Sequence, residues 1–132
     1  MIVGATSADL GGPDGFMIAG AERVASLLSK EDVPVYKYKF SYVSSSSEAS
    51  GVQGAAHATD IPFFMGTVDA RYGTATSQRD REAAVEANAR LVNFIRTGDP
   101  SVEGADEWPR YTSSAPCVLD FAADGSRHVS CR

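Results

Sequence analysis

The sequence predicts an α/β layer architecture, and three patterns support this fold class. Strand-like runs occur at residues 2–3 and 35–43, and a hairpin pattern covers residues 118–129. Two helix patterns lie between them, one near residues 15–30 and one at about residues 78–97. Strands separated by helices favour a sheet covered by helices. A chain of 132 residues, 43% hydrophobic and 22% charged, is expected to form one unit over residues 1–132.

Local signals mark the first strand and the first helix. Ile2 and Val3 read as the end of a short buried strand that runs into a glycine-rich loop over residues 4–12. Asp14 is expected to cap a helix from about Gly15 to Lys30. The apolar face of that helix holds Met17, Ala21, Val24, Leu27 and Leu28.

The strand pattern at residues 35–43 carries an aromatic face. Alternate positions on this face are occupied by Tyr36, Tyr38, Phe40 and Tyr42. Because three or four strands make a thin sheet, we expect this strand to keep an open edge and its aromatic side chains to lack a cover. Low stability of the isolated chain, and self-association through residues 35–43, are the expected results.

The middle of the chain combines a loop with a well-marked helix. Residues 44–56 are small and polar, which predicts a flexible surface loop. Ser77 and Asp80 have the spacing of a capping box, and Gly98 followed by Pro100 ends the helix that this box opens. The face expected to be buried holds Ala84, Ala87, Leu91 and Ile95.

Two cysteines, Cys117 and Cys131, flank the terminal hairpin pattern. A five-residue loop would place them opposite each other. Two cysteines do not make a disulfide framework, however, so unpaired thiols are the expectation.

Charge and hydropathy argue against several functions. The net charge is −5 and the twelve basic residues are scattered, which argues against nucleic-acid binding. No apolar run approaches the roughly 18–20 residues of a membrane span. The first residues carry no signal-peptide pattern, and the compartment stays open.

His57 is a candidate general base. It follows a strand and a loop, and small residues at positions 54–56 and 58 would let a substrate approach closely. A neutral imidazole is the commonest general base near pH 7. A single histidine can also be structural, so that alternative stays open.

Asp9 is a candidate partner for this histidine. It lies on the loop after the first strand, where open α/β sheets place ligand-contacting residues. An acid followed later by a histidine is the chain order of the last two members of an α/β-hydrolase triad. A role in the turn alone is the alternative. A metal site of His57, Asp60 and Asp9 is a weaker hypothesis, because one histidine among scattered carboxylates is a poor ligand set; no metal or cofactor is expected.

Five ordered motifs resemble the C-terminal third of the type-B carboxylesterase and cholinesterase family. They are VGATSADLGG, PVYKYKFSYV, GAAHATDIPFFMG, LVNFIRTGDPS and EWPRYT, and the similarity runs from about residue 2 to 121. The resemblance implies a partial α/β-hydrolase fold of the three-layer αβα type. It also implies hydrolysis of carboxylic esters through a serine, an acid and a histidine.

The resemblance assigns roles to particular residues. Asp9 matches the triad acid, at a position where glutamate is usual, and His57 matches the triad base. Asp60 matches an acid just after the histidine, which is expected to support the loop rather than to react. A structural signature at the end of the late helix is matched by Asn93, Phe94, Gly98, Asp99 and Pro100.

The chain also departs from the family pattern. The 132 residues contain no G-x-S-x-G elbow and no His-Gly-Gly-Gly segment, and the stretch from Asp9 to His57 is shorter than usual. We therefore expect the chain to supply the acid and the histidine to a serine on another segment, with a small carboxylic ester as substrate. The alternative is an inactive remnant that serves as a binding or interaction domain. An in-frame G-x-S-x-G encoded just upstream would favour the first hypothesis.

The purified chain is expected to show no turnover of short-chain p-nitrophenyl esters above the background of free imidazole. A triad without its nucleophile and oxyanion donors loses most of its acceleration. The measurement is the initial rate against substrate concentration. A saturable rate that His57→Ala abolishes, or labelling of any serine by a fluorophosphonate, would refute this expectation.

Overall fold

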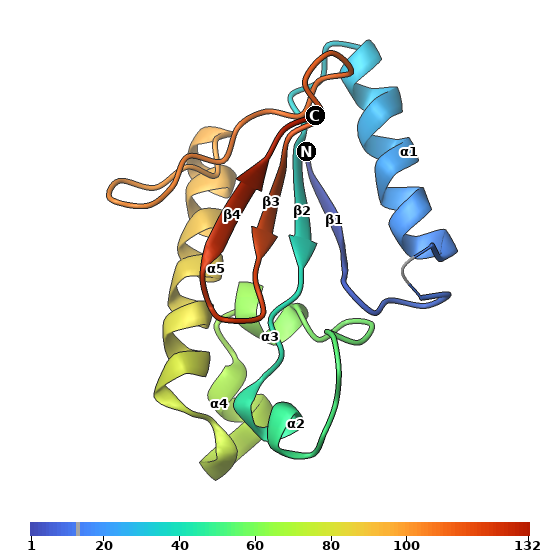
Figure 1. Ribbon diagram of the computed structural model, residues 1–132. Helices are drawn as coiled ribbons and strands as arrows, with labels where there is room; N and C mark the ends of the chain where they lie inside the picture. Colours follow the sequence, from blue (N-terminus) through green and yellow to red (C-terminus); the bar gives the residue numbers. More distant parts are fainter. Residues whose placement is uncertain (13) are drawn as a thin grey trace.

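The computed structural model describes residues 1–12 and 14–132, and its centre is a four-stranded sheet. The strand order is β1 (Ile2–Thr6), β2 (Tyr36–Phe40), β3 (Val118–Phe121) and β4 (Arg127–Ser130). The β1–β2 and β2–β3 pairs are parallel, and β3 and β4 form the antiparallel hairpin. Figure 1 shows helix α1 (Phe16–Lys30) beside β1 and the longer α5 (Gln78–Thr97) behind the other side of the sheet.

Four short elements lie between β2 and α5. They are α2 (Ser45–Ala49), α3 (Ile61–Phe64), α4 (Val68–Tyr72) and a 3₁₀ turn (Gly73–Ala75). The predicted flexible loop at 44–56 therefore contains one helical turn. Ser44 starts that turn, because its side chain accepts a hydrogen bond from the Ser47 N–H.

Two apolar clusters, one on each face of the sheet, give the fold three layers. Side chains on alternate positions of a strand point to opposite faces. Ile2, Tyr36 and Phe40 belong to the large cluster that includes the α5 alanines. Val3 and Val35 belong to a smaller cluster with Ala25 of α1 and with Tyr111. The predicted α/β fold of the αβα type is confirmed.

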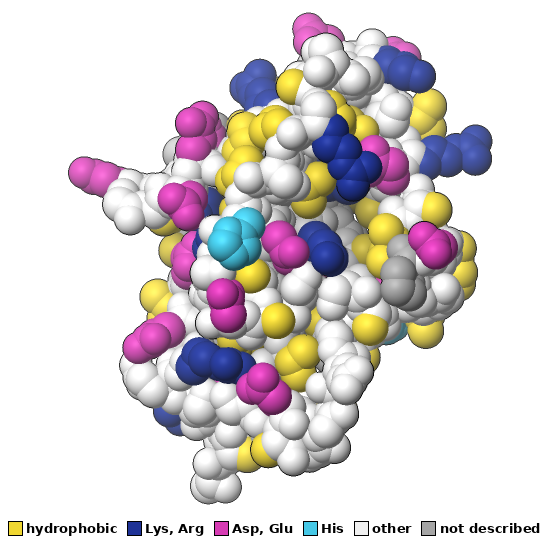
Figure 2. All heavy atoms as spheres, viewed as in Figure 1, with side chains coloured by type: hydrophobic (Ala, Val, Ile, Leu, Met, Phe, Trp, Pro, Cys, Tyr) yellow, Lys and Arg dark blue, Asp and Glu magenta, His cyan; other side chains and the backbone are white. Residues whose placement is uncertain are grey.

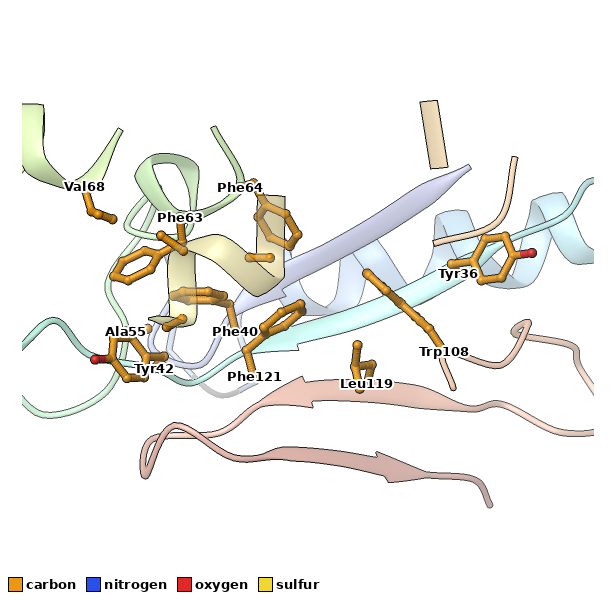
Figure 3. Packing of buried hydrophobic residues seen from close by; sticks show 13 residues of the cluster. Tyr36, Phe40, Tyr42, Ala55, Phe63, Phe64, Val68, Trp108, Leu119 and Phe121 are labelled. Atoms are coloured by element: carbon orange, nitrogen blue, oxygen red, sulfur yellow. The ribbon is translucent and has the colours of Figure 1, made fainter. Parts of the chain in front are cut away.

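The expectation that strand 35–43 has an open edge and an uncovered aromatic face is wrong. β2 is an interior strand, paired with β1 on one side and β3 on the other. Its aromatic side chains are packed under Phe63, Phe64, Trp108 and α5, as Figure 3 shows. The residues that cover β2 are far from it in the sequence, so the local pattern at residues 35–43 could not predict them. Self-association therefore cannot be argued from an exposed aromatic face.

The first strand is longer than predicted, and Gly4 lies within it. The strand includes residues 4–6, which the sequence assigned to a loop. A Cβ on Gly4 would lie 2.5 Å from the ring of Tyr38, so the aromatic ring takes the place of a side chain. Glycine here permits close packing of β1 against β2.

Helix α1 differs in detail from its prediction. Gly15, rather than Asp14, is the N-cap, and no side chain caps the helix. The buried residues are Ala21 and Ala25, whereas Val24 and Leu27 are exposed. On α5, Ala84 and Ala87 are buried as predicted but Ile95 is exposed.

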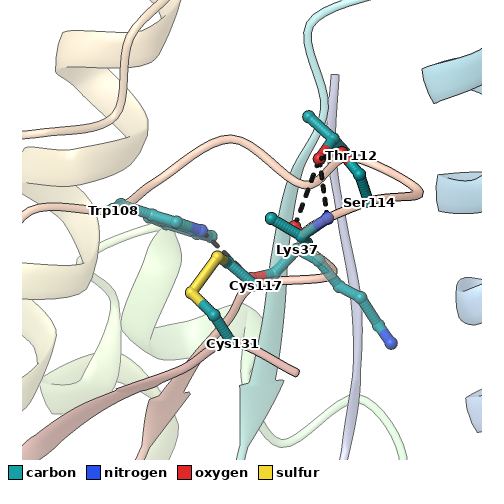
Figure 4. Close-up of a disulfide and its surroundings, with 7 residues drawn as sticks. Lys37, Trp108, Thr112, Ser114, Cys117 and Cys131 are labelled. Atoms are coloured by element: carbon teal, nitrogen blue, oxygen red, sulfur yellow. Dashed lines mark hydrogen bonds between the residues drawn. A yellow bond between two sulfur atoms is a disulfide. The ribbon is translucent and has the colours of Figure 1, made fainter.

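The C-terminal hairpin forms as predicted, and its cysteines are paired. Cys117 and Cys131 form a disulfide that joins the start of β3 to the end of β4 (Figure 4). The expectation of unpaired thiols is therefore wrong. Next to the disulfide, the Trp108 indole N–H donates to the Lys37 carbonyl at 3.0 Å, which fixes the linker against β2.

Charged side chains of both signs are interspersed on the face seen in Figure 2. Over the part of the chain that the structure describes, none of the helices has the length and apolar character to cross a membrane.

The N-terminus of α5 is built around Asp80, and the predicted capping box is confirmed. The buried carboxylate accepts hydrogen bonds from the Tyr42 hydroxyl at 2.9 Å, the Ser45 N–H at 3.0 Å and the Ser77 N–H at 2.8 Å. Burial raises the pKa of Asp80, but the hydrogen bonds from Ser77, Ser45 and Tyr42 outweigh burial, and the net pKa is lowered.

Asp80→Ala is expected to lower the free energy of unfolding by about 2–4 kcal/mol, because several buried donors lose their acceptor. Since the folded-state pKa is lowered, wild type keeps this stabilisation above the ordinary pKa of 3.8 and loses it as the pH falls through the folded-state value. Urea unfolding at pH 7 and near pH 3 measures both effects. Asp69→Ala, which removes an exposed partner of Arg81, is the control and should cost less than about 1 kcal/mol. Equal losses in the two variants would contradict the assignment.

Candidate active site

The loops that follow β1 and β2 lie side by side at the carboxyl edge of the sheet. The Ser7 N–H donates to the Phe40 carbonyl at 2.8 Å, and the Ala8 N–H donates to the Ala55 carbonyl at 2.9 Å. Ala8 and Ala56 form an isolated parallel bridge. The sheet pairing therefore continues past the strands and carries residue 9 towards residue 57.

Two unusual backbone conformations shape the second loop. Gly54 has φ +75°, and a Cβ there would lie 2.9 Å from the Ala8 Cβ, so this close approach favours glycine. Ala58 has φ 64°, a conformation that non-glycine residues adopt infrequently. The conformation of Ala58 turns the backbone directly after His57, and the chain then enters α3.

Asp9 and His57 are brought into direct contact. The Asp9 Oδ1 lies 2.6 Å from the His57 Nδ1, although 48 positions separate the two residues. The Asp9 side chain is 4% exposed and the His57 side chain is 47% exposed. Because an ionised carboxylate only accepts hydrogen bonds, Nδ1 is the donor, and Nε2 of a neutral ring is left to accept a proton.

The backbone around Asp9 holds its carboxylate in the charged form. The Leu10 N–H donates to Oδ1 at 2.8 Å, and the Thr6 N–H donates to Oδ2 at 3.1 Å. Burial raises the pKa of Asp9, but hydrogen bonds from Leu10, His57 and Thr6 together lower it below its ordinary value. Asp9 is thus a fixed anion at neutral pH.

Asp60 hydrogen-bonds to strand β2, whereas the imidazole hydrogen-bonds to Asp9. The Tyr38 hydroxyl donates to Asp60 Oδ2 at 2.7 Å. Burial, with the nearby charges of Asp60 and Asp9, raises the pKa of Tyr38 well above its usual value, so the hydroxyl stays a donor. This bond ties the start of α3, three residues after His57, to β2.

Tyr38 is a supporting residue that the sequence did not single out. Its alternation with other aromatic residues indicated a core side chain, and no local signal distinguishes a core tyrosine from one that orients a loop. The adjoining Phe63 and Phe64 anchor the same loop from above, because both are buried against Phe40.

The other candidate groups lie elsewhere. The Ser45 hydroxyl is 2.6 Å from the Ser77 hydroxyl and belongs to the Asp80 network, whereas Ser44 caps α2. Within residues 1–12 and 14–132, no group of three or more His, Cys, Asp or Glu side chains is placed to hold a metal ion.

The chain is similar to known proteins in sequence and in fold. The sequence profile of the Carboxylesterase family matches residues 12–130. This chain belongs to the carboxylesterase family. The matched range includes His57, while Asp9 lies just before it.

Similarity to individual carboxylesterase-family proteins covers only part of their length. The chain is 30% identical over 98 residues to phenmedipham hydrolase from Pseudarthrobacter oxydans, which covers 70% of the chain and 20% of that protein. Its fold is similar to an esterase from Clostridium hathewayi that can hydrolyse aliphatic aromatic polyesters, with a TM-score of 0.75 and 20% identity over 88% of the chain and 22% of that protein. A PNB esterase gives a TM-score of 0.70 at 20% identity, over 87% of the chain and 22% of that protein. The chain thus spans about a fifth of the length of these relatives.

We expect neutral His57 to carry its proton on Nδ1, because Asp9 accepts from that nitrogen. Long-range ¹H–¹⁵N spectra at about pH 8, above the ordinary imidazole pKa, identify the protonated nitrogen. Asp9→Ala should abolish the Nδ1-protonated signal of His57 and leave the signals of His128 unchanged, which makes His128 an internal control. A wild-type His57 protonated on Nε2 would contradict the hydrogen-bond assignment.

Proposed function

We propose that residues 1–132 are a single C-terminal segment of a type-B carboxylesterase domain, and that Asp9 and His57 are the acid and the base of its catalytic triad. The observation that supports this proposal is the 2.6 Å contact between a buried carboxylate and a half-exposed imidazole. Family membership and the similar folds of two esterases give further support.

In the proposed mechanism, Nε2 of His57 removes the proton from a serine hydroxyl as the serine oxygen attacks the ester carbonyl. The resulting imidazolium is stabilised by ionised Asp9, which stays deprotonated throughout. His57 then gives the proton to the departing alcohol oxygen, which leaves an acyl-serine. Water activated by the same imidazole hydrolyses the acyl-serine and releases the acid, with no cofactor.

The serine and the oxyanion donors must come from polypeptide outside these 132 residues, because the sequence has no G-x-S-x-G. The proposed substrate class is a small carboxylic ester. An ester substrate is supported by the similar esterase from Clostridium hathewayi, which can hydrolyse aliphatic aromatic polyesters.

The alternative function is a non-catalytic binding domain derived from the same fold. The absence of a G-x-S-x-G nucleophile elbow from the sequence favours this alternative. The shortened stretch between Asp9 and His57 favours it as well. The two functions differ in one consequence. Only the catalytic proposal requires that His57 become essential when a serine-bearing portion is supplied.

A chimera tests that consequence. The segment of phenmedipham hydrolase that matches this chain is replaced by residues 1–132, and hydrolysis of p-nitrophenyl acetate is measured. The chimera should be active, and His57→Ala and Asp9→Ala should each lower kcat/KM by roughly 10³- to 10⁴-fold or more, as in other triads.

The matched control is His128→Ala, which removes an exposed imidazole on β4 and should leave activity within about twofold of the chimera, as for surface changes away from the site. A folded chimera without activity, or one whose rate is indifferent to His57→Ala, would favour the binding-domain alternative.

A further inference from the structure

We infer that the outer face of α5 is an interface between two copies of this chain, which pair through α5 in antiparallel orientation. The inference goes beyond the proposed function, because it uses none of the residues that hold Asp9 and His57. It assigns one surface of the molecule and the partner that fits this surface.

The outer face of α5 carries an apolar stripe. This helix belongs to the layer that covers one side of the sheet (Figure 1), and it turns Ala84 and Ala87 toward the core. At 3.6 residues per turn, the opposite side of the helix holds Val85, Ala89 and Val92. Val85 is 70% exposed and Val92 is 43% exposed. Apolar residues at i, i+4 and i+7 form the narrow seam that is typical of a contact between two helices.

An apolar groove lies along this stripe. It measures about 390 Å³, and Val102 from the segment after α5 forms part of its wall. Four of its lining residues have the spacing i, i+3, i+4 and i+7, namely Glu82, Val85, Glu86 and Ala89. Four residues in this arrangement make the hole that receives one side chain of a facing helix. The groove therefore fits an apolar side chain that another helix presents.

The stripe and the groove complement each other in a two-fold dimer. An isologous interface uses the same patch of surface on both protomers. If the two-fold axis passes midway between Val85 and Val92, antiparallel pairing brings the partner's Val92 to the groove beside Val85. Ala89 then lies near the axis, where its small side chain lets the two helices approach closely.

Charge on the rim of the stripe favours the same orientation. Glu82 precedes Val85 by one turn, and Arg96 follows Val92 by one turn. Antiparallel pairing places Glu82 beside the partner's Arg96, and the two-fold axis repeats this pair. Parallel pairing would instead place Glu82 beside the partner's Glu82.

Both rim charges are available for such a pair. Glu82 and Arg96 are exposed, and within residues 1–12 and 14–132 neither has an ion-pair partner. The neighbouring acid, Glu86, is already bound by Arg90 and Arg127. Glu82 is therefore the acid of this face that a second copy can engage.

The size of the contact sets the expected strength. α5 has 20 residues and is about 30 Å long. A single helix pair lies at the low end of the range of specific interfaces, so we expect a reversible dimer that half forms at roughly 10–100 μM.

Sedimentation velocity on the full 132-residue chain, from about 1 to about 500 μM, tests the interface. Val85→Glu should weaken dimerisation about tenfold or more, because it places a charge in the apolar seam. Val24→Glu is the matched control, since Val24 is 40% exposed on α1, and this variant should dimerise as wild type. Circular dichroism should show that every variant is folded.

Charge reversal tests the orientation. Glu82→Arg and Arg96→Glu should each weaken the homodimer about tenfold, because like charges then meet twice. An equal mixture of these two variants should form a heterodimer with a Kd within about threefold of wild type, since both pairs again join opposite charges.

Four results would overturn the inference. They are a wild-type chain that stays monomeric at about 500 μM, a dimer that Val85→Glu leaves intact, an equal loss in Val24→Glu, and a mixture of the charge-reversed variants that stays monomeric.

Discussion

The parallel pairing of β1 with β2, in a register that sets Thr6 opposite Phe40, is the constraint on which the site depends. Both strands end at the same edge because they run in the same direction. The chain segments that follow them must then leave the sheet together, and the bonds of Ser7 and Ala8 keep them paired beyond the strands. Asp9 and His57 meet because both loops leave the sheet at this shared edge and stay paired through Ser7 and Ala8.

The two members of the pair are held by different means. Asp9 is fixed by the backbone N–H groups of Thr6, at the end of β1, and of Leu10, which favour its charged form. His57 is fixed from a distance, through the Tyr38–Asp60 hydrogen bond and the aromatic packing of α3. A carboxylate held rigidly beside a solvent-accessible imidazole is a suitable arrangement for a general base, because such a base exchanges protons with a group that approaches from solvent.

Sequence reasoning succeeded where the signal was local. The capping box at Ser77, the glycine stop at Gly98 and the terminal hairpin each depend on residues a few positions apart. It failed where distant residues decide the outcome: β2 proved to be interior because β3 pairs with it from more than 75 positions away. The sequence assigned Gly4 to a loop, because only the structure shows that the Tyr38 ring fills the space that a side chain at position 4 would take. The Asp9–His57 contact could be anticipated only through chain order and family resemblance, while the Tyr38–Asp60 support left no local trace.

The disulfide also constrains the edge strand β4. β4 is an edge strand with mostly exposed side chains, the kind of element that frays and is digested first. The bond between Cys131, which follows β4, and Cys117, which precedes β3, closes the base of the hairpin. Under oxidising conditions the cross-link holds the end of β4 beside the start of β3, whereas under reducing conditions β4 keeps its ladder with β3 and the Arg127–Glu86 ion pair.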